Sequence, residues 1–113
     1  MTHSMQLQLS PFEMIRDGTK TIELRLFDEK RKKIQIGDTI VFTNTQSREI
    51  LEVKVLELLL FDTFETLYNQ LPLLDCGYTE DDAGTASPDD MNVYYPKEMQ
   101  QKYGVVGIRV ALL

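Results

Sequence analysis

Three charged residues near the start of the chain have the types and spacing that can do chemistry. Lys20, Glu23 and Arg25 lie close together, shortly after a glycine at position 18. Opposite charges placed this close can hold a lysine and an arginine in a fixed geometry. They also shift one another's pKa, as happens in many ligand-binding and catalytic sites. Such a group can bind a polar ligand, catalyse an acid–base reaction, or form a salt-bridge cluster with a purely structural role.

Few other side chains can supply catalytic or metal-binding chemistry. His3 is the only histidine and Cys76 the only cysteine, so the chain has no internal disulfide and too few ligands for a usual zinc site. We expect His3 at a frayed end of the chain and Cys76 in a half-buried loop. We expect neither a metal nor a cofactor. Acid–base chemistry would therefore fall to Lys, Glu, Asp or Tyr side chains.

The charge of the chain is uneven along its length. The net charge of −6 argues against tight, non-specific binding to nucleic acid, because such binding requires many phosphates to be neutralised. Residues 1–36 nevertheless hold seven Lys or Arg against five acids, including the basic run 30–33, whereas the remainder holds five against thirteen. One basic surface on an otherwise acidic body is the arrangement that this distribution favours.

The length and hydropathy of the chain indicate one globular domain over residues 1–113. A chain of 113 residues can bury a hydrophobic core without help from disulfides or metals. No apolar run approaches the ~20 residues that a membrane helix needs. The N-terminus lacks the charged-then-apolar pattern of a signal peptide, so we expect a cytoplasmic protein that does not bind a membrane.

Hydrophobic periodicity predicts the elements that position the charged residues. Five segments have strand character, at residues 5–9, 21–26, 38–43, 49–60 and 105–113. Helices are indicated at 11–17 and 64–70 and, on either side of Pro96, from residues 88 and 97, with a charged helical turn at 28–33. The second half of the 49–60 strand is almost entirely apolar, so we expect it to be buried on both faces.

The strand at 21–26 has two different faces. Ile22, Leu24 and Leu26 point one way, while Thr21, Glu23 and Arg25 point the other way. Charges on the second face can be collected at the mouth of a barrel. With hairpin-length connections, the order of elements predicts an α+β domain, a small mixed or antiparallel barrel of five to six strands flanked by short helices.

The combined motif resembles the ASCH domain, a branch of the PUA-like β-barrels. The family pattern is G-x-K-x-x-E-x-R, then a basic stretch, then a hydrophobic-Gly-Asp turn before a strand. The chain fills these positions with Gly18, Lys20, Glu23, Arg25 and the turn Gly37–Asp38. Tyr94-Tyr95-Pro96 and Lys102-Tyr103-Gly104-Val105 are also similar, so the resemblance covers residues 5–111 and suggests a small single-domain member of bacterial type.

The resemblance implies a pseudo-barrel with a cleft beside the motif strand that binds RNA or a nucleotide-like ligand. Lys20 and Arg25 would match the basic residues of that cleft and Glu23 its acidic residue, with Lys30 and Arg31 beside them. Tyrosines can stack on bases, as they do in many proteins that bind single-stranded RNA. The expected stacking residues are Tyr94, Tyr95 and Tyr103.

A second hypothesis follows from the same resemblance. Some small bacterial members are amidohydrolases that remove an acyl group from N4-acylcytidine, using a Lys, a Thr nucleophile three residues later and a distant Glu. Here Lys20 matches the lysine, Glu23 occupies the threonine position, and Thr21 and Glu80 are possible helpers. The acidic segment 79–90 could act as a lid over the cleft. The third hypothesis is that the charged cluster has only a structural role.

Overall fold

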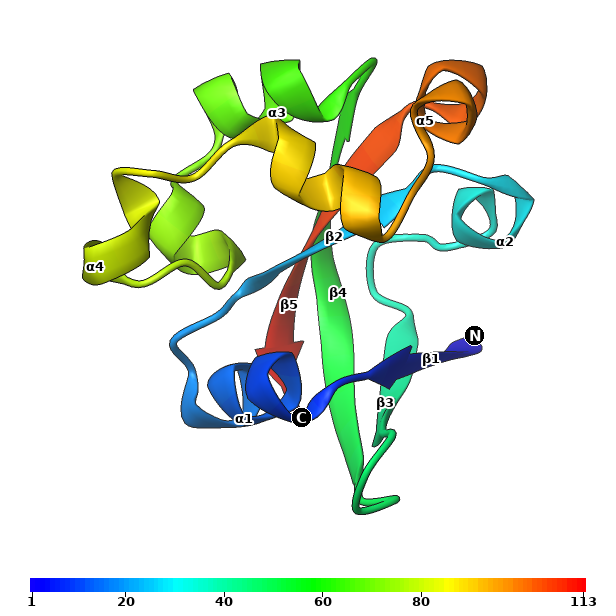
Figure 1. Cartoon of the computed structure of the whole chain (residues 1–113). Helices are drawn as coiled ribbons and strands as arrows, with labels where there is room; N and C mark the ends of the chain where they lie inside the picture. The colour runs from blue at the N-terminus through cyan, green and yellow to red at the C-terminus, as the bar shows by residue number, and fades with distance from the viewer.

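A computed structural model describes residues 1–113, whose five strands form one mixed sheet (Figure 1). In sequence order the strands are β1 (Thr2–Leu7), β2 (Ile22–Leu26), β3 (Thr39–Asn44), β4 (Ile50–Phe61) and β5 (Val105–Leu112). Across the sheet the order is β1-β3-β4-β5-β2. The β1–β3 pair is parallel and the other pairs are antiparallel.

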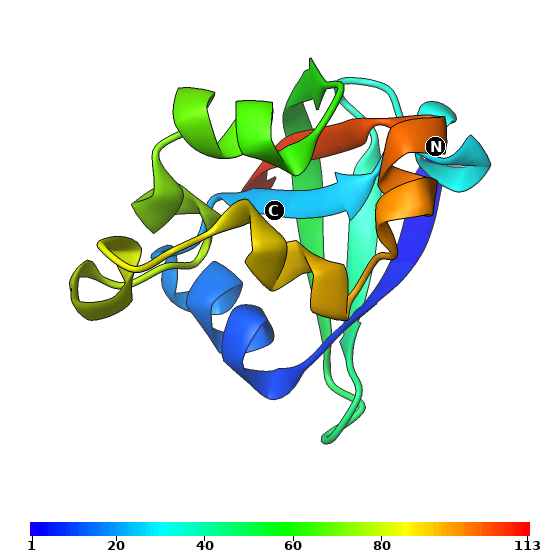
Figure 2. The ribbon, with the colours of Figure 1, turned by 45° about the horizontal axis from the view of Figure 1, so that its top comes forward.

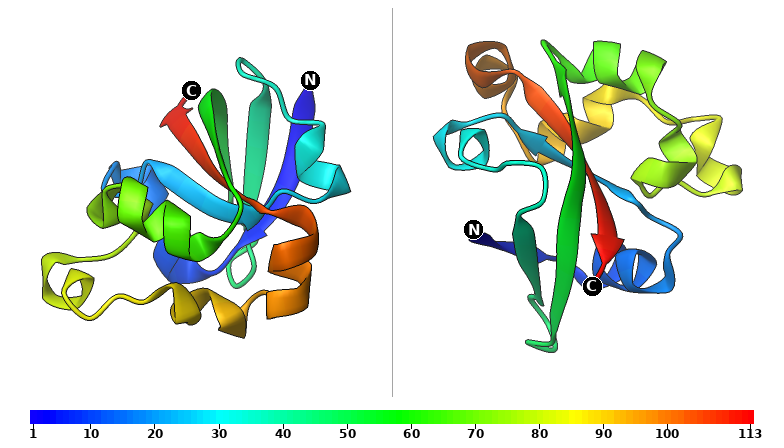
Figure 3. Two further views of the ribbon diagram at one scale, coloured as in Figure 1. Left: turned by 90° about the horizontal axis from the view of Figure 1, so that it is seen from above. Right: turned by 180° about the vertical axis from the view of Figure 1, so that it is seen from behind.

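The sheet curls so strongly that its two edge strands approach each other. Seen from above, the strands follow an arc that has β1 and β2 at its ends (Figure 3). The guanidinium of Arg25 in β2 donates a hydrogen bond of 2.8 Å from Nη2 to the carbonyl oxygen of Gln6 in β1. This bond joins the two edges, and the resulting half-barrel with flanking helices confirms the predicted α+β architecture.

Short helices fill the connections between strands. Helix α1 (Leu9–Asp17) links β1 to β2, and α2 (Glu29–Lys32) follows β2. The long crossover from β4 to β5 contains α3, η1, α4, η2 and α5, at Phe64–Gln70, Leu73–Cys76, Glu80–Ala83, Pro88–Val93 and Lys97–Tyr103. Helix α1 and the 3-10 helix η2 lie on the same side of β2 (Figure 2). No helix is long and apolar enough to span a membrane.

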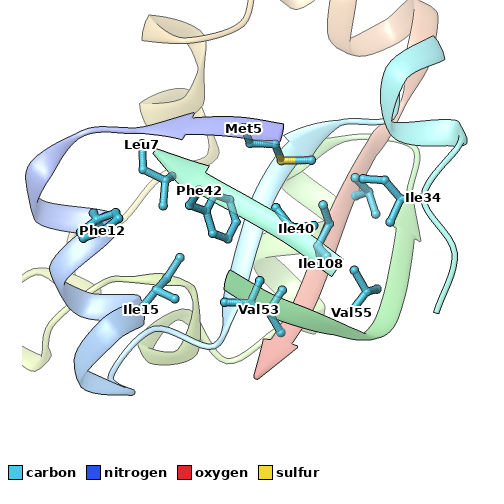
Figure 4. Close-up of a cluster of buried hydrophobic side chains, with 12 residues drawn as sticks. Met5, Leu7, Phe12, Ile15, Ile34, Ile40, Phe42, Val53, Val55 and Ile108 are labelled. Atoms are coloured by element: carbon cyan, nitrogen blue, oxygen red, sulfur yellow. The ribbon is translucent and has the colours of Figure 1, made fainter. Parts of the chain in front are cut away.

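The hydrophobic core has two parts, one on each side of β2. The larger part lies inside the curled sheet, where Phe42, Ile40 and Val53 pack against Phe12 and Ile15 of α1 (Figure 4). The second part packs the apolar face of β2 under α3 and η1, with the buried side chains Ile22, Leu24, Leu26, Phe64, Leu67, Tyr68, Cys76 and Val105. On the polar face of β2, Glu23 is buried and Arg25 is partly buried.

The second half of β4 is not buried on both faces, contrary to the sequence prediction. Leu56 is 44% exposed and Leu60 is 55% exposed. The pairing explains the error, because β3 reaches only Lys54 of β4 and beyond this point β4 has β5 as its sole neighbour. A register shift between Val55 and Glu57 also interrupts the alternation of side chains.

The segment between η1 and η2 is not structureless. The side-chain hydroxyl of Thr79 and the Asp82 carboxylate form a capping box at the start of α4, and Ser87 caps η2 with Asp90 in the equivalent role. These local bonds give residues 79–90 a defined path. Cys76, expected in a half-buried loop, is instead buried in η1.

Asp38, in the Gly37–Asp38 turn before β3, fixes the start of the sheet. Its Oδ2 accepts hydrogen bonds from the ring Nε2 of His3 at 2.8 Å and from the backbone N–H of Gln35 at 3.0 Å. His3 therefore lies in β1 opposite Ile40 and is not frayed. The hydrogen bond from His3, followed by that from Gln35, lowers the pKa of Asp38 from 3.8 to about 2.

We expect the Asp38 carboxylate to stabilise the fold only where it is ionised. Its folded pKa of about 2 lies below the unfolded value of 3.8, so the stabilisation is complete above that value and is lost as the pH falls through about 2. Urea unfolding of Asp38→Asn should show lower stability than the unsubstituted protein at pH 5 and a shrinking difference toward pH 2. A difference that does not change with pH would contradict this account.

Candidate functional site

The charged triplet forms a buried cluster around a single carboxylate. Lys20 Nζ lies 2.8 Å from Glu23 Oε1, and Arg25 Nη2 lies 2.8 Å from Glu23 Oε2. Arg25 Nε donates to the same Oε2 at 3.0 Å. Glu23 is 4% exposed and Lys20 is 9% exposed. One carboxylate therefore holds two cations in a fixed geometry, one at each oxygen.

The backbone brings this cluster together through local turns and one long-range contact. Gly18 ends α1 with a φ of 84°, in the left-handed region where glycine is favoured. The N–H of Thr21 then donates to the carbonyl of Asp75 in η1 at 2.8 Å, just before β2 begins. β2 pairs with β5, so Glu23 lies opposite Ile108 in the sheet. These backbone hydrogen bonds alone fix the direction of the motif strand.

Gly77 gives the Lys20 side chain the space that it occupies. A Cβ placed on Gly77 would lie 3.1 Å from Cδ of Lys20 and 3.7 Å from its Nζ. Gly77 also has a φ of 106°, a conformation that other residues adopt only with strain. The turn after η1 therefore closes over the lysine stem and directs its ammonium group toward Glu23.

Electrostatics favour the charged forms of Glu23 and Arg25. Burial acts most strongly on Glu23 and would raise its pKa, but the charges of Lys20 and Arg25 and their hydrogen bonds outweigh it, so the pKa is lowered. For Arg25, burial acts to lower the pKa, whereas the Glu23 carboxylate and then Tyr95 hold it above the ordinary value. Counted with the ammonium of Lys20, the cluster formally carries two positive charges and one negative charge.

The cluster forms one wall of a cavity of about 500 Å³, a size typical of small-molecule sites. The cavity lies between β2, the β1–α1 junction and the segment from η1 to η2. Besides the triplet, its lining includes side chains from all of these elements, among them Gln6, Pro11, Met14, Tyr68, Cys76, Tyr78, Asp82, Asp90, Met91, Tyr94 and Tyr95. Charged, apolar and aromatic groups thus converge on one space.

A chain of hydroxyl groups lines the cavity beside the charged cluster. The Tyr78 hydroxyl donates to Asp90 Oδ2 at 2.8 Å. Because that bond uses the only proton of Tyr78, the Tyr68 hydroxyl, 2.6 Å away, is the donor to Tyr78. Burial, followed by the hydrogen bonds with Tyr68 and Asp90, raises the pKa of Tyr78. The hydroxyls therefore stay protonated and act as neutral hydrogen-bonding groups.

Two further tyrosines lie on the η2 side of the cavity. Tyr95 stacks on Phe64 of α3 with ring centroids 6.1 Å apart, so its position is fixed by the second core. Burial raises the pKa of Tyr95, while the charge of Arg25 acts in the opposite direction. Tyr94 is 61% exposed and contributes an aromatic face to the same cavity.

Comparisons with known proteins identify the family. The model of the ASCH domain family matches residues 5–113. The chain belongs to the ASCH domain family. The hypothetical protein PH0355 is similar over 100% of both chains, with 31% identity and a TM-score of 0.83. Protein PF0455 from Pyrococcus furiosus is also 31% identical over 100% of this chain and 98% of its own, with a TM-score of 0.73.

A more distant structure shares the fold alone. An ASCH domain from Lactobacillus crispatus is 12% identical, with a TM-score of 0.63 over 98% of this chain and 79% of its own. A search of the curated proteins found no match. Membership of the family therefore comes with no activity assigned by these relatives, and the function must be argued from the site.

The ASCH cavity brings together some of the predicted site residues and not others. Lys20, Glu23, Arg25, Tyr94 and Tyr95 all line it. Lys30 and Arg31 line a second, smaller pocket on the other side of Arg25. Thr21, Glu80 and Tyr103 line neither pocket. The Tyr103 ring instead lies under Lys102, whose Nζ is 5.1 Å from the ring centroid.

Several cavity residues were not foreseen from the sequence. Tyr68 lies on α3, where only a helix was predicted, Tyr78 lies where no helix or strand was predicted, and Asp90 lies in the helix predicted from residue 88. They lie more than forty residues from the motif strand in sequence and approach it only through tertiary packing. The spacing of residues within their own segments does not predict that contact. The only feature of the sequence that could have predicted the turn at Gly77, with its φ of 106°, is the glycine itself.

Cys76 lines the cavity but is not a suitable nucleophile. Burial, acting against the nearby charge of Lys20, raises the pKa of the thiol to about 11. The thiolate is the reactive form of cysteine, and it is scarce at neutral pH when the pKa is this high. Cys76 therefore packs as a small apolar group against the second core.

We expect Glu23→Gln to destabilise the domain strongly. The substitution keeps the shape but leaves Lys20 and Arg25 close together without their shared negative charge. Breaking a buried ion pair in this way costs about 3 kcal/mol or more. Urea unfolding at pH 7 should report a loss of this size.

Glu57→Gln is the matched control for that experiment. Glu57 bonds to Arg109 at 3.0 Å, but both side chains are well exposed to solvent. Loss of an exposed pair should change the free energy of unfolding by no more than about 1 kcal/mol. Equal losses in the two variants would show that the Glu23 cluster contributes no more than a surface salt bridge.

The contact between Gly77 and Lys20 also gives a testable expectation. Gly77→Ala adds a methyl group against the lysine stem in a backbone conformation that disfavours alanine, so stability should fall by about 1–2 kcal/mol. The Lys20 ammonium should move, which side-chain NMR signals of its NH₃⁺ group would detect. Gly84→Ala is the control, since nothing lies within 4 Å of the added Cβ. An unchanged Lys20 signal in Gly77→Ala would contradict the packing argument.

Proposed function

We propose that the protein binds a nucleotide or a single-stranded RNA segment by enclosing one base in the cavity. The observation that carries this proposal is that Lys20 and Arg25, buried and fixed by Glu23, line the same cavity as Tyr94 and Tyr95. Fixed hydrogen-bond donors beside aromatic faces are the combination that recognises an unstacked base.

The fixed cations have donors to spare for a ligand. Lys20 has three N–H groups, and one salt bridge to Glu23 occupies its ammonium. Arg25 has five N–H groups and uses three of them, on Nε and Nη2, to bind Glu23 and Gln6, while Tyr95 also interacts with the guanidinium. These donors match the carbonyl and ring-nitrogen acceptors on the edges of bases.

The acidic groups of the cavity favour a neutral ring over a phosphate within it. Asp82 and Asp90 line the cavity together with the two cations and Glu23, so the formal charges of its lining residues sum to about −1. A phosphate placed there would face three carboxylates, whereas a neutral base can accept from Lys20 and Arg25 and donate to Asp90. Tyr94 supplies an exposed aromatic face for stacking.

The hydrolase hypothesis has less support from the geometry. Thr21 and Glu80 do not line the cavity, and both oxygens of Glu23 are occupied by cations. The Cys76 thiol is neutral at pH 7 because its pKa is about 11. A nucleophile activated by a neighbouring base is what amide hydrolysis of this kind requires. Binding without hydrolysis is accordingly the function that we propose.

Base binding is tested by titrating the ¹⁵N-labelled protein with the four ribonucleosides and with short single-stranded oligoribonucleotides. We expect amide shifts around β2 and η2 and a Kd that rises in Tyr94→Ala by about tenfold or more, since stacking on an aromatic side chain contributes about 1–3 kcal/mol per base. Val93→Ala is the matched control, because Val93 is the exposed neighbour of Tyr94 and does not line the cavity.

Two results would overturn the proposal. The first is that none of these probes shifts the amides of the cavity residues, and the second is that Tyr94→Ala binds as tightly as Val93→Ala. Incubation with N4-acetylcytidine provides a separate arm of the test. We expect no release of acetate, and release that depends on Lys20 would replace binding by the hydrolase hypothesis.

A further inference from the structure

A second pocket lies next to the base cavity and shares two residues with it. It is lined by Ser4, Met5, Gln6, Arg25, Lys30, Arg31 and Thr43. Gln6 and Arg25 also line the first cavity, so the two spaces meet at the point where β2 is bonded to β1. A ligand larger than one base would therefore reach the second pocket by passing the Arg25 side chain.

The two pockets differ sharply in charge. Three cations, Arg25, Lys30 and Arg31, line the second pocket and no carboxylate does. The nearest acids are already neutralised, since Glu23 is bound to Lys20 and Arg25, and Asp28 is bound to Arg31 at 2.9 Å. The base cavity, in contrast, includes three carboxylates. An anionic group is thus favoured in the second pocket and disfavoured in the first.

Several donors that line the second pocket have no partner in the protein. Lys30 makes neither a salt bridge nor a hydrogen bond, whereas Lys32 of the same helix lies 3.7 Å from Glu29. Arg31 uses Nη1 on Asp28, while its Nε is buried without any acceptor. The Lys30 ammonium is therefore available to an anionic ligand in this pocket.

The hydroxyl groups of the pocket point to the same class of ligand. Ser4 in β1 and Thr43 in β3 line it and make no side-chain hydrogen bond within the protein. Hydroxyls together with Arg and Lys side chains are the usual protein partners of phosphate oxygens. Carboxylates, which would select a metal ion instead, do not line the pocket.

We propose that this second pocket, formed by α2, β1, β2 and β3, is a phosphate subsite that holds the phosphate attached to the base bound in the main cavity. The inference rests on the proposed function for the identity of the ligand, but the charge of the pocket is independent of it. The ligand class is thereby narrowed from nucleosides to nucleotides, with the phosphate as a monoester or as the phosphodiester of an RNA chain.

The subsite is tested with matched probes on the ¹⁵N-labelled full chain. The probes are inorganic phosphate, one ribonucleoside, its 5′- and 3′-monophosphates, and the corresponding dinucleoside monophosphate. The ribonucleoside is one that binds in the first titration or, if none binds, one used at its highest soluble concentration. We expect phosphate alone to shift the amides of residues 4–6 and 30–31, and a monophosphate to bind about tenfold tighter than the nucleoside, as charge-assisted hydrogen bonds imply. This gain should shrink as salt is added.

Lys30→Gln and Lys32→Gln form a matched pair of variants. Both change one exposed lysine of α2, but only Lys30 lines the pocket. We expect Lys30→Gln to remove most of the gain that the phosphate provides while leaving nucleoside affinity unchanged, and Lys32→Gln to leave both unchanged. A dinucleotide that binds tighter than both monophosphates would assign the subsite to an RNA chain, and the opposite order to a free nucleotide.

The outcomes separate this inference from the proposed function. If phosphate shifts the subsite amides in a Lys30-dependent way but nucleosides leave the cavity unchanged, the subsite is supported and base binding fails. If nucleosides bind but monophosphates bind no tighter, or the gain survives in Lys30→Gln, base binding is supported and the subsite is wrong. If phosphate shifts no amide of residues 4–6 and 30–31, the subsite is wrong irrespective of the nucleoside result.

Discussion

One buried carboxylate organises the part of the molecule that can bind a ligand. Glu23 takes Lys20 at one oxygen and Arg25 at the other, each at 2.8 Å. Removing three charged groups from water is costly, and the cost is offset only because each charge lies against an opposite one with good geometry. Through Arg25 the cluster reaches the carbonyl of Gln6 in β1, and through Lys20 it contacts the turn at Gly77. It therefore ties together three parts of the chain that are distant in sequence.

The structural role of this cluster is compatible with the binding role that we propose for it. The bond from Arg25 to Gln6 connects the two edges of a sheet that has no other strand pairing between them. The same guanidinium forms part of the wall of both pockets. A cation fixed in this way loses little conformational entropy when a ligand binds, so preorganisation contributes to affinity. The cluster therefore both joins the sheet edges and lines the cavity in which we propose that a ligand binds.

The sequence predicted local features well and long-range features poorly. Alternation in β2 and the glycine before Lys20 predicted the motif strand, because both signals are contained in a few neighbouring residues. The apolar run in β4 gave a wrong prediction of burial on both faces, because the exposure of Leu56 and Leu60 depends on where β3 ends. Likewise, Tyr78 and Asp90 enter the cavity through packing of η1 and η2 over β2, and no periodicity in their own segment encodes that contact.

The distribution of charge is compatible with the proposal that this acidic protein binds a nucleotide. The chain carries a net charge of −6, which opposes the non-specific, phosphate-driven binding of long nucleic acids. Lys30, Arg31 and Arg25 nevertheless gather around one pocket, and their field is short-ranged because salt screens it within about 8–10 Å. A phosphate is therefore attracted only when it lies inside this pocket. In the proposed complex, the base bound in the neighbouring cavity would hold the phosphate in that position. High affinity would then require one ligand that fills both pockets. The negative charge of the rest of the protein would repel anionic ligands that fit neither pocket.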